Sequence, residues 1–409
     1  MLQVRQQTLY SYVSRGLIRS FTQPGRKARL YLRDDIERMS ARSRARSGHG
    51  AVAASAMNLG EPITSTAVTE ITAAGPRYRG RFAHDLARMH APFESVAELL
   101  WTGLWPEHPP KWPVQRPAPS LSRLMDSLVA LQTGDQVIEI FALVTLHLGV
   151  RRGSVSERIH KGRTLDAAKE IIHALVGCCG LSSSMGRYVP MQGGQTVLQG
   201  LLRALAIEPT EENQEAISSM LVLLADHELS PGTFAARVAA SSGATVHACI
   251  ASALCASSGL EIGRLYTRVH DFLDGASSKG VLLARARKLQ KRGLVVPGFV
   301  HPMYPQGDPR AAQLLEIAGR REEKPPTLTA ALAFAEQMRS QFGLLPRHEF
   351  SAVLLCRALG LPRCVPESLF AVARVAGWVA HVQEQRLSGA LLRPRGKFVG
   401  AGEAAFLSA

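Results

Sequence analysis

The chain is poor in the features that mark membrane, secreted and zinc-stabilised proteins. Only 6 of its 409 residues are cysteines, and no two of them form a C-x-x-C pair. Neither a zinc site nor a disulfide framework is therefore indicated. No apolar run reaches the roughly 18 residues of a membrane span, and the N-terminus lacks the apolar core of a signal peptide. We expect a cytoplasmic protein that binds no metal and makes no contact with membranes.

Aromatic residues and β-branched runs are also scarce. Aromatic residues make up 6% of the chain, and Ala, Leu and Arg dominate its composition, which favours helices over strands. Neither G-x-G-x-x-G nor G-x-x-x-x-G-K-[ST] occurs, so a nucleotide-binding fold of either type is not expected. The hydrophobic fraction of 46% and the charged fraction of 20% are typical of a soluble globular protein. The length predicts two or three domains, mainly helical.

Positive charge is concentrated at the N-terminus. The formal net charge is +15, and residues 1–50 contain eleven Lys and Arg against Asp34, Asp35 and Glu37. Just over half of the excess therefore lies in an eighth of the chain. A basic N-terminal module suggests contact with nucleic acid, and the alternative is an unstructured, solubilising tail.

Residues 1–40 have the pattern of a small folded unit. The run Thr8–Val13 places apolar residues at helical spacing. A turn follows at Gln23–Arg26, then a strand-like run at Leu30–Leu32. Asp34 begins a helix with acidic residues in its first turn, which the helix dipole favours.

This unit resembles a MerR-like winged helix-turn-helix. The resemblance implies that the helix with Thr8 and Tyr12 is the recognition helix and that the Pro24–Arg29 hairpin is the wing. The helix that supports the recognition helix would precede Met1, so we expect a partial module. DNA binding, and a remnant that packs on the main domain, both stay open.

A basic linker and a long helical domain follow. Residues 41–56 are a linker by composition, and the main domain spans residues 57–409. Apolar residues at helical spacing predict helices at Phe93–Leu100, Pro325–Phe342 and Leu369–His381.

Polar residues end an apolar helix near the middle of the chain. The apolar run that starts at Leu221 ends in Asp226-His227-Glu228, and Pro231-Gly232 marks a break. Titratable groups at the end of a buried helix must be hydrated or paired. We therefore expect them to face a cleft, and the alternative is a structural histidine that caps the helix.

The stretch Val295–Arg310 interrupts the helices with a loop. It contains four prolines and two glycines, so it cannot form an ordinary helix. It also carries His301, Asp308 and Arg310. A loop of this kind usually positions a ligand, and the alternative is a structural turn whose His and Arg are solvated.

Three arginines later in the chain suggest an anionic ligand. Arg310, Arg374 and Arg393 could converge on a polycarboxylate, because the guanidinium fork matches carboxylate geometry. For each arginine taken alone, a solvated surface position is the alternative.

Six short motifs in the main domain resemble those of one enzyme family. They occur in the order seen in citrate synthases: Tyr78-Arg79-Gly80, Ala225–Glu228, Pro297–His301, Asp308–Arg310, Phe370–His381 and Arg393–Arg395. The resemblance runs from about Met57 to Gly400, and the chain is most similar to bacterial paralogues with an N-terminal helix-turn-helix. It implies an almost all-α, obligate homodimer with a large domain and a small mobile domain at roughly 263–360.

The resemblance also implies an activity. Family members condense acetyl-CoA, or another acyl-CoA, with oxaloacetate to give citrate and CoA. Acetyl-CoA would be a co-substrate, and no cofactor would be bound permanently. His227 and His301 would hydrogen-bond oxaloacetate, and His301 would also polarise its ketone. Arg310 and Arg374 would clamp the carboxylates, and Arg393 would do so from the partner subunit.

The CoA site and two departures complete the comparison with the family. The backbone of Val295, Val296, Pro297 and Gly298 would line the site of the CoA adenine. Ile262 stands where family members have the histidine that stabilises the enol of acetyl-CoA, and Arg264 replaces a glycine. Glu349 replaces the aspartate that serves as general base. Loss of one hydrogen-bond donor to an enolate oxygen, such as the histidine that Ile262 replaces, typically lowers the rate by a factor of about 10²–10³. Val300 also replaces the usual Gly before His301.

Two main hypotheses follow. Glu349, His301 and the arginines support an active citrate synthase-like acyltransferase. Ile262 and the altered base support an impaired paralogue that binds a dicarboxylate or CoA as a regulator or heterodimer partner. A DNA-binding repressor that senses citrate or oxaloacetate is a third class.

Overall fold

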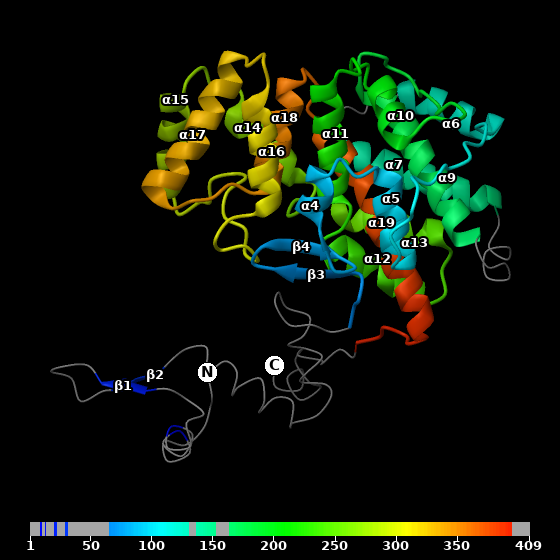
Figure 1. Ribbon diagram of the computed structural model, residues 1–409, viewed down its shortest axis with the longest axis horizontal. Coiled ribbons are helices and arrows are strands. Elements are labelled where there is room, and N and C mark those ends of the chain that lie inside the picture. The colour runs from blue at the N-terminus through cyan, green and yellow to red at the C-terminus, as the bar shows by residue number, and fades with distance from the viewer. Residues whose placement is uncertain are drawn as a thin grey trace, which may run out of the picture. The chain divides into compact units, whose positions relative to one another are not determined.

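The structure is a computed structural model (Figure 1). It describes residues 65–130, 136–152 and 163–394, together with Leu9, Val13, Ser20–Thr22 and Arg29–Tyr31. Contacts divide the chain into two compact units: residues 1–65 with 393–409, and residues 66–392.

The first unit contains a β-hairpin. Strand β1 (Ser20–Thr22) pairs antiparallel with β2 (Arg29–Tyr31). The predicted strand-like run is thus confirmed, one residue earlier than expected. Leu9 and Val13, from the predicted recognition helix, are helical. The rest of the predicted helix-turn-helix lies outside the described residues, so DNA binding stays a prediction.

The second unit is mainly helical, which confirms the predicted all-α class. Its helices are α4 (Ala83–Arg88), α5 (Phe93–Thr102), α6 (Pro119–Ala130), α7 (Val137–Arg152), α9 (Arg163–Cys178), the 3₁₀ helix η1 (Cys179–Ser182), α10 (Val197–Ala204), α11 (Glu211–Leu224), α12 (Pro231–Ser241), α13 (Val246–Ser257), α14 (Arg264–Leu273), α15 (Lys279–Lys291), α16 (Pro309–Arg320), α17 (Pro326–Phe342), α18 (His348–Ala358) and α19 (Val365–Ser388). Among the described residues, no helix has the length and apolarity to cross a membrane. Helices α14 to α18 fall within 263–360, and the predicted small domain stays a prediction.

Helix α19 is the central element of this unit. Coloured orange to red in Figure 1, it runs between α5, α9, α11, α12 and α13. From Leu369 to Val382 every residue is buried. A helix that is apolar all round is suited to such a position. Gly377 lets α19 pack closely against the residues that follow α11, because a Cβ at this position would lie 2.1 Å from Asp226 Oδ1.

A small antiparallel sheet is the main feature that the composition did not predict. Its strands, in order, are β3 (Thr69–Thr72), β4 (Gly75–Tyr78) and β5 (Arg81–Phe82). Between β4 and β5, Arg79 and Gly80 both have positive φ, 47° and 87°, as a type I′ hairpin turn requires. The sheet brings Tyr78 to the end of α11.

Two helix starts lie next to predicted site residues. The break predicted near Pro231-Gly232 is confirmed, because α11 ends at Leu224 and Pro231 begins α12, at a first-turn position where its missing N–H is no loss. Helix α18 begins at His348, so Glu349 lies in its first turn. The helix dipole favours a carboxylate there.

Candidate active site

The predicted site residues gather where four segments meet. These are the connection from α11 to α12, the loop before α16, the start of α18 and the middle of α19. Five of the predicted residues are buried there: His227, His301, Arg310, Glu349 and Arg374. Buried titratable groups thus gather at the end of α11, and the predicted cleft stays a prediction.

Tyr78 fixes the end of α11. Its hydroxyl lies 3.1 Å from the carbonyl oxygen of Val222 and 3.2 Å from those of Leu223 and Asp226. The phenol is fully buried. It therefore compensates carbonyl groups that the end of the helix leaves unpaired, and it holds the backbone next to His227.

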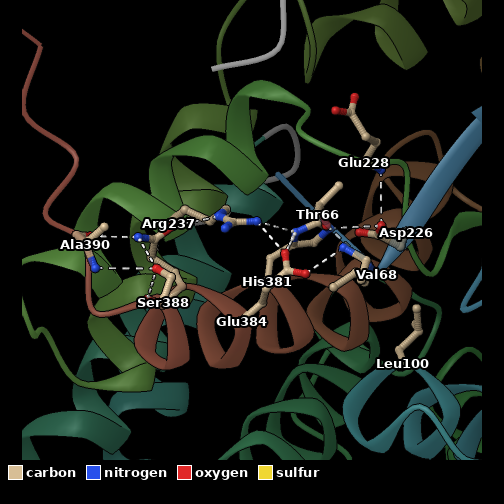
Figure 2. Close-up of polar contacts among 12 residues, drawn as sticks. Thr66, Val68, Leu100, Asp226, Glu228, Arg237, His381, Glu384, Ser388 and Ala390 are labelled. Carbon is tan, nitrogen blue, oxygen red and sulfur yellow. Dashed lines mark hydrogen bonds and ion pairs between the residues drawn. The ribbon is translucent and has the colours of Figure 1, made fainter. Parts of the chain in front are cut away.

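A polar network links Asp226, the residue before His227, to His381, Arg237 and Glu384 (Figure 2). Asp226 Oδ2 lies 3.2 Å from His381 Nε2. On the other side of that ring, Arg237 Nη1 lies 3.4 Å from Nδ1 and 2.6 Å from Glu384 Oε2. Glu384 Oε1 accepts a hydrogen bond from Ala67 N at 2.7 Å. Asp226 is thus anchored through Oδ2, while its Oδ1 is buried without a hydrogen bond within the described residues. The contact of Oδ2 with His381 positions the backbone that leads into His227.

Two histidines and a tyrosine form the centre of the site. The rings of His227 and His301 lie 5.5 Å apart. Tyr304 lies against both, and its hydroxyl is 2.9 Å from His227 Nε2. Burial, followed by the charges of Arg310 and Arg374, holds the pKa of His227 well below its usual value. The ring is therefore neutral at pH 7.

His301 is arranged as a hydrogen-bond donor. Burial and then the charge of Arg310 lower its pKa to about 3, so the ring is neutral. Its Nδ1 accepts a hydrogen bond from the backbone N–H of Met303 at 3.2 Å. The ring proton must then be on Nε2. Nε2 makes no hydrogen bond within the described part of the chain and can donate to a ligand.

Val300 carries backbone strain next to His301. Its φ is +61°, a left-handed conformation that β-branched residues rarely adopt. The Val300 N–H donates to the carbonyl oxygen of Leu345 at 2.9 Å, and the Arg347 N–H donates to that of Gly298 at 2.8 Å. These bonds fasten the loop to the start of α18 and maintain the strained conformation.

Asp308 and Arg310 form a buried, bidentate ion pair. Arg310 Nε lies 2.9 Å from Oδ1, and Nη2 lies 2.8 Å from Oδ2. Asp308 also caps α16 by accepting from the Arg310 backbone N–H. Burial raises the pKa of Asp308, but Arg310 and then His348 hold it well below its usual range. Arg310 Nη1 is buried and has no partner among the described residues.

Arg374 supplies a second buried guanidinium. It projects from α19 and is 3% exposed. Its Nε donates to the Leu224 carbonyl oxygen at 2.7 Å, and its guanidinium stacks 4.7 Å above the Phe370 ring. Within the described residues its two terminal nitrogens make no hydrogen bond, so they can bind an anion.

Glu349 is held by its neighbours in sequence. Arg347 binds both of its oxygens, from Nη2 to Oε1 at 2.7 Å and from Nε to Oε2 at 3.1 Å. His348 Nδ1 lies 3.3 Å from Glu349 Oε2 and 3.4 Å from Asp308 Oδ2. Burial raises the pKa of Glu349, but His348 and Arg347 lower it by more, so the carboxylate is ionised.

The sequence of the chain matches the model of one known protein family. The family described as "Citrate synthase, C-terminal domain" matches residues 58–395, most of the chain. The chain belongs to the citrate synthase family. This confirms the family predicted from the motifs, while the subtype with an N-terminal helix-turn-helix stays a prediction.

Relatives within the citrate synthase family are only moderately similar. The chain is 33% identical over 201 residues to a putative citrate synthase 2 of Mycobacterium tuberculosis, covering 48% of this chain and 54% of that protein. Citrate synthase 2 of Bacillus subtilis is 31% identical over 205 residues, covering 49% and 55%. The chain thus spans about half the length of these relatives. A 2-methylcitrate synthase of M. tuberculosis is 26% identical over 338 residues, covering 79% and 84%.

Solved citrate synthases share the fold. The enzyme of Thermoplasma acidophilum, in ternary complex with carboxymethyl coenzyme A and oxaloacetate, superposes with a TM-score of 0.76 at 21% identity. That match covers 84% of this chain and 95% of the other. The citrate synthase of Thermotoga maritima gives 0.67 at 22% identity, covering 84% and 94%.

Ile262 and Arg264 are the positions where the sequence predicts a departure from the citrate synthase pattern, which stays a prediction. Ile262 is half-buried in the turn between α13 and α14, and Arg264 is exposed at the first residue of α14. Gly263 packs this turn closely, because a Cβ there would lie 2.5 Å from the Ser257 carbonyl oxygen. Ile262 has no hydrogen-bond donor in its side chain, and Arg264 does not join the buried cluster.

Arg393 and the segment Val295–Gly298 are the remaining predicted site residues. Arg393 is exposed and belongs to the other unit, so its role across a dimer stays a prediction. Of the predicted CoA-binding segment, Val295 is exposed and Val296 is buried. Gly298 is confined, since a Cβ there would lie 2.7 Å from Phe350 Cβ. Among the described residues, no group of His, Cys, Asp and Glu is arranged to hold a metal ion.

Sequence reasoning missed three side chains of the site. Tyr304, Arg347 and His348 were not assigned roles, although each lies within three residues of a predicted residue. Spacing along the chain gave a signal for Tyr304, since it follows His301 in the same loop. No local pattern indicates that Arg347 turns back onto Glu349.

Proposed function

We propose that this chain condenses acetyl-CoA, or another acyl-CoA, with oxaloacetate to give citrate and free CoA. The observation that carries the proposal is a pair of buried guanidiniums, Arg310 and Arg374, beside two neutral histidines. Buried cations with free donors favour an anionic ligand. Oxaloacetate has two carboxylates and a ketone, which match these donors.

Binding of the dicarboxylate would use the unpaired donors. Arg310 Nη1 and the terminal nitrogens of Arg374 would each bind carboxylate oxygens. His301 Nε2–H would then donate to the ketone oxygen. A neutral donor suits this task, because its hydrogen bond strengthens as negative charge develops on that oxygen.

The chemistry would begin at the acyl-CoA. Glu349 would take a proton from the carbon next to the thioester, and the electron pair of that C–H bond would form the enolate. The carbon would attack the ketone carbon of oxaloacetate. The alkoxide oxygen would accept a hydrogen bond from His301 and take the proton from Glu349. Water would then cleave the thioester, leaving a carboxylate and releasing the thiol.

The partners follow the family resemblance. In this proposal the chain acts as a homodimer, and Arg393 of the partner subunit adds a third guanidinium to each site. The backbone of residues 295–298 would contact the CoA adenine. No permanently bound cofactor is needed, because acetyl-CoA is consumed as a substrate.

Product analysis tests the proposal. The full chain is incubated with oxaloacetate and acetyl-CoA labelled with ¹³C in the acetyl group, and thiol release and labelled citrate are measured together. We expect both products in equal amounts. Absence both of labelled citrate from acetyl-CoA and of labelled 2-methylcitrate from ¹³C-labelled propionyl-CoA would contradict the proposed reaction.

A second candidate function is ligand binding without turnover. Two observations favour it: Arg347 occupies both oxygens of Glu349, and Ile262 supplies no donor. The chain would then bind a dicarboxylate as a regulator or heterodimer partner. Thermal stabilisation by oxaloacetate without thiol release would support this candidate over the first.

A further inference from the structure

Tyr266 carries a buried hydroxyl without a partner. It lies on α14 and is 3% exposed. Its oxygen makes no hydrogen bond within the described part of the chain. A buried polar group left unpaired costs about 1–3 kcal/mol, and buried tyrosine hydroxyls usually find a partner. The missing partner is therefore expected to be a ligand.

The surroundings of Tyr266 belong to the candidate site. Its ring centroid lies 6.1 Å from that of Phe370, whose ring carries the Arg374 guanidinium, and 6.3 Å from that of His348. Burial raises its pKa well above the usual value, and the charges of Glu349, Arg374 and Arg310 also act on that pKa. The phenol therefore keeps its proton at neutral pH and can only donate or accept as a neutral group.

The position of Tyr266 relative to Ile262 is informative. Ile262 lies in the turn that leads into α14, and Tyr266 lies in the first turn of that helix. Tyr266 has the longer side chain and carries an O–H donor, whereas Ile262 carries none. Helix α14 also packs against α18, whose first turn holds Glu349.

We propose that the Tyr266 hydroxyl donates the hydrogen bond that stabilises the enolate oxygen of the acyl-CoA. The inference rests on the proposed condensation. Glu349 takes the proton from carbon, the C–H electron pair becomes the C=C bond, and the carbonyl π electrons move to oxygen. That oxygen accepts the hydrogen bond, and Tyr266 keeps its own proton. Arg347 is already bound to Glu349, whereas the Tyr266 hydroxyl has no partner within the described residues.

The test is Tyr266→Phe, which removes the hydroxyl and keeps the ring. The full chain is assayed for kcat and KM of thiol release, and oxaloacetate binding is followed by thermal shift. We expect kcat to fall about 10²–10³-fold, with the thermal shift by oxaloacetate unchanged. The control is Tyr188→Phe, a largely buried phenol beside Gly177 on α9, which should leave kcat unchanged.

Binding of carboxymethyl-CoA tests the same hydrogen bond without turnover. Its carboxylate oxygen stands in for the enolate oxygen. In the presence of oxaloacetate, Tyr266→Phe should weaken its binding at least tenfold, whether or not the wild type turns over.

Two results would overturn the inference. One is a Tyr266→Phe variant that keeps kcat within threefold of the wild type, and the other is unchanged affinity for carboxymethyl-CoA. If the wild type binds neither oxaloacetate nor carboxymethyl-CoA, the proposed function itself fails and the inference with it. If the wild type turns over and Tyr266→Phe has no effect on kcat, the role of Tyr266 is rejected while the proposed condensation stands.

Discussion

Arg347 donates two hydrogen bonds to the carboxylate of Glu349, 2.7 and 3.1 Å long. The two residues are separated only by His348, at the start of α18. Bidentate pairing of this kind stabilises the ionised carboxylate. It also lowers the pKa of Glu349 and so weakens it as a base, although the enolisation step needs a carboxylate free to accept a proton.

Arg347→Asn should release Glu349. The pKa of the carboxylate then rises, because burial is no longer opposed by the guanidinium. We expect kcat of thiol release to increase on the order of tenfold and the acid limb of the pH–rate profile to move to higher pH. The control is Arg339→Asn, which removes an exposed pair with Glu336. A profile and rate equal to those of the wild type would show that the pair does not restrain the base.

Asp308→Asn should destabilise the fold. The change leaves Arg310 as a buried guanidinium without its counter-charge, which typically costs about 3–5 kcal/mol. Urea unfolding, read from helical circular dichroism, measures the loss. Glu336→Gln, on the surface of α17, should leave the unfolding midpoint unchanged. Equal midpoints for Asp308→Asn and the wild type would mean that Arg310 does not depend on Asp308.

The location of the cluster was predictable, and its internal pairing was not. Asp226 and His227 end an apolar run, and His301 lies in a loop rich in proline, so burial and backbone chemistry already indicated a cleft. The tautomer of His301 depends on the Met303 N–H, a contact set by the fold of the loop. Spacing along the chain carries no information about such contacts.

The fold was predicted in class but not in every element. A helix was predicted at Leu369–His381, and α19 contains it within Val365–Ser388. The sheet β3–β5 was missed because its strands have only two to four residues, too few for a clear alternation of apolar and polar positions. Its Arg79-Gly80 turn also has a residue that type I′ turns seldom use.

Val300→Gly should stabilise the protein. Val300 adopts a φ of +61°, which strains a β-branched residue by about 1–3 kcal/mol. Glycine accepts this conformation but has more freedom in the unfolded chain, so we expect a net gain of about 1 kcal/mol. Val295→Gly is the matched control, since Val295 lies in the same loop without positive φ and should lose stability. A lower melting temperature for Val300→Gly would contradict the strain assigned to this residue.

Stability should fall as the pH decreases from about 6.5 to 4. Burial lowers the pKa of His173 and of His270 to about 4, while an unfolded histidine has a pKa of about 6.5. The unfolded chain therefore takes up protons first, and stability is fully present only above that value. His270→Leu should flatten the plot of melting temperature against pH, because neither ring nitrogen of His270 has a partner in the described structure. If the plot for His270→Leu has the same slope as that for the wild type, the pH dependence of stability does not come from His270.

The central claim is that His301, Arg310 and Arg374 form a site for a dicarboxylate. Titration of the full chain with oxaloacetate by isothermal calorimetry tests it most directly. We predict saturable binding with one oxaloacetate per chain, weakened at least tenfold by Arg374→Gln. An absence of saturable binding, or equal affinity for the Arg374→Gln variant, would contradict the account.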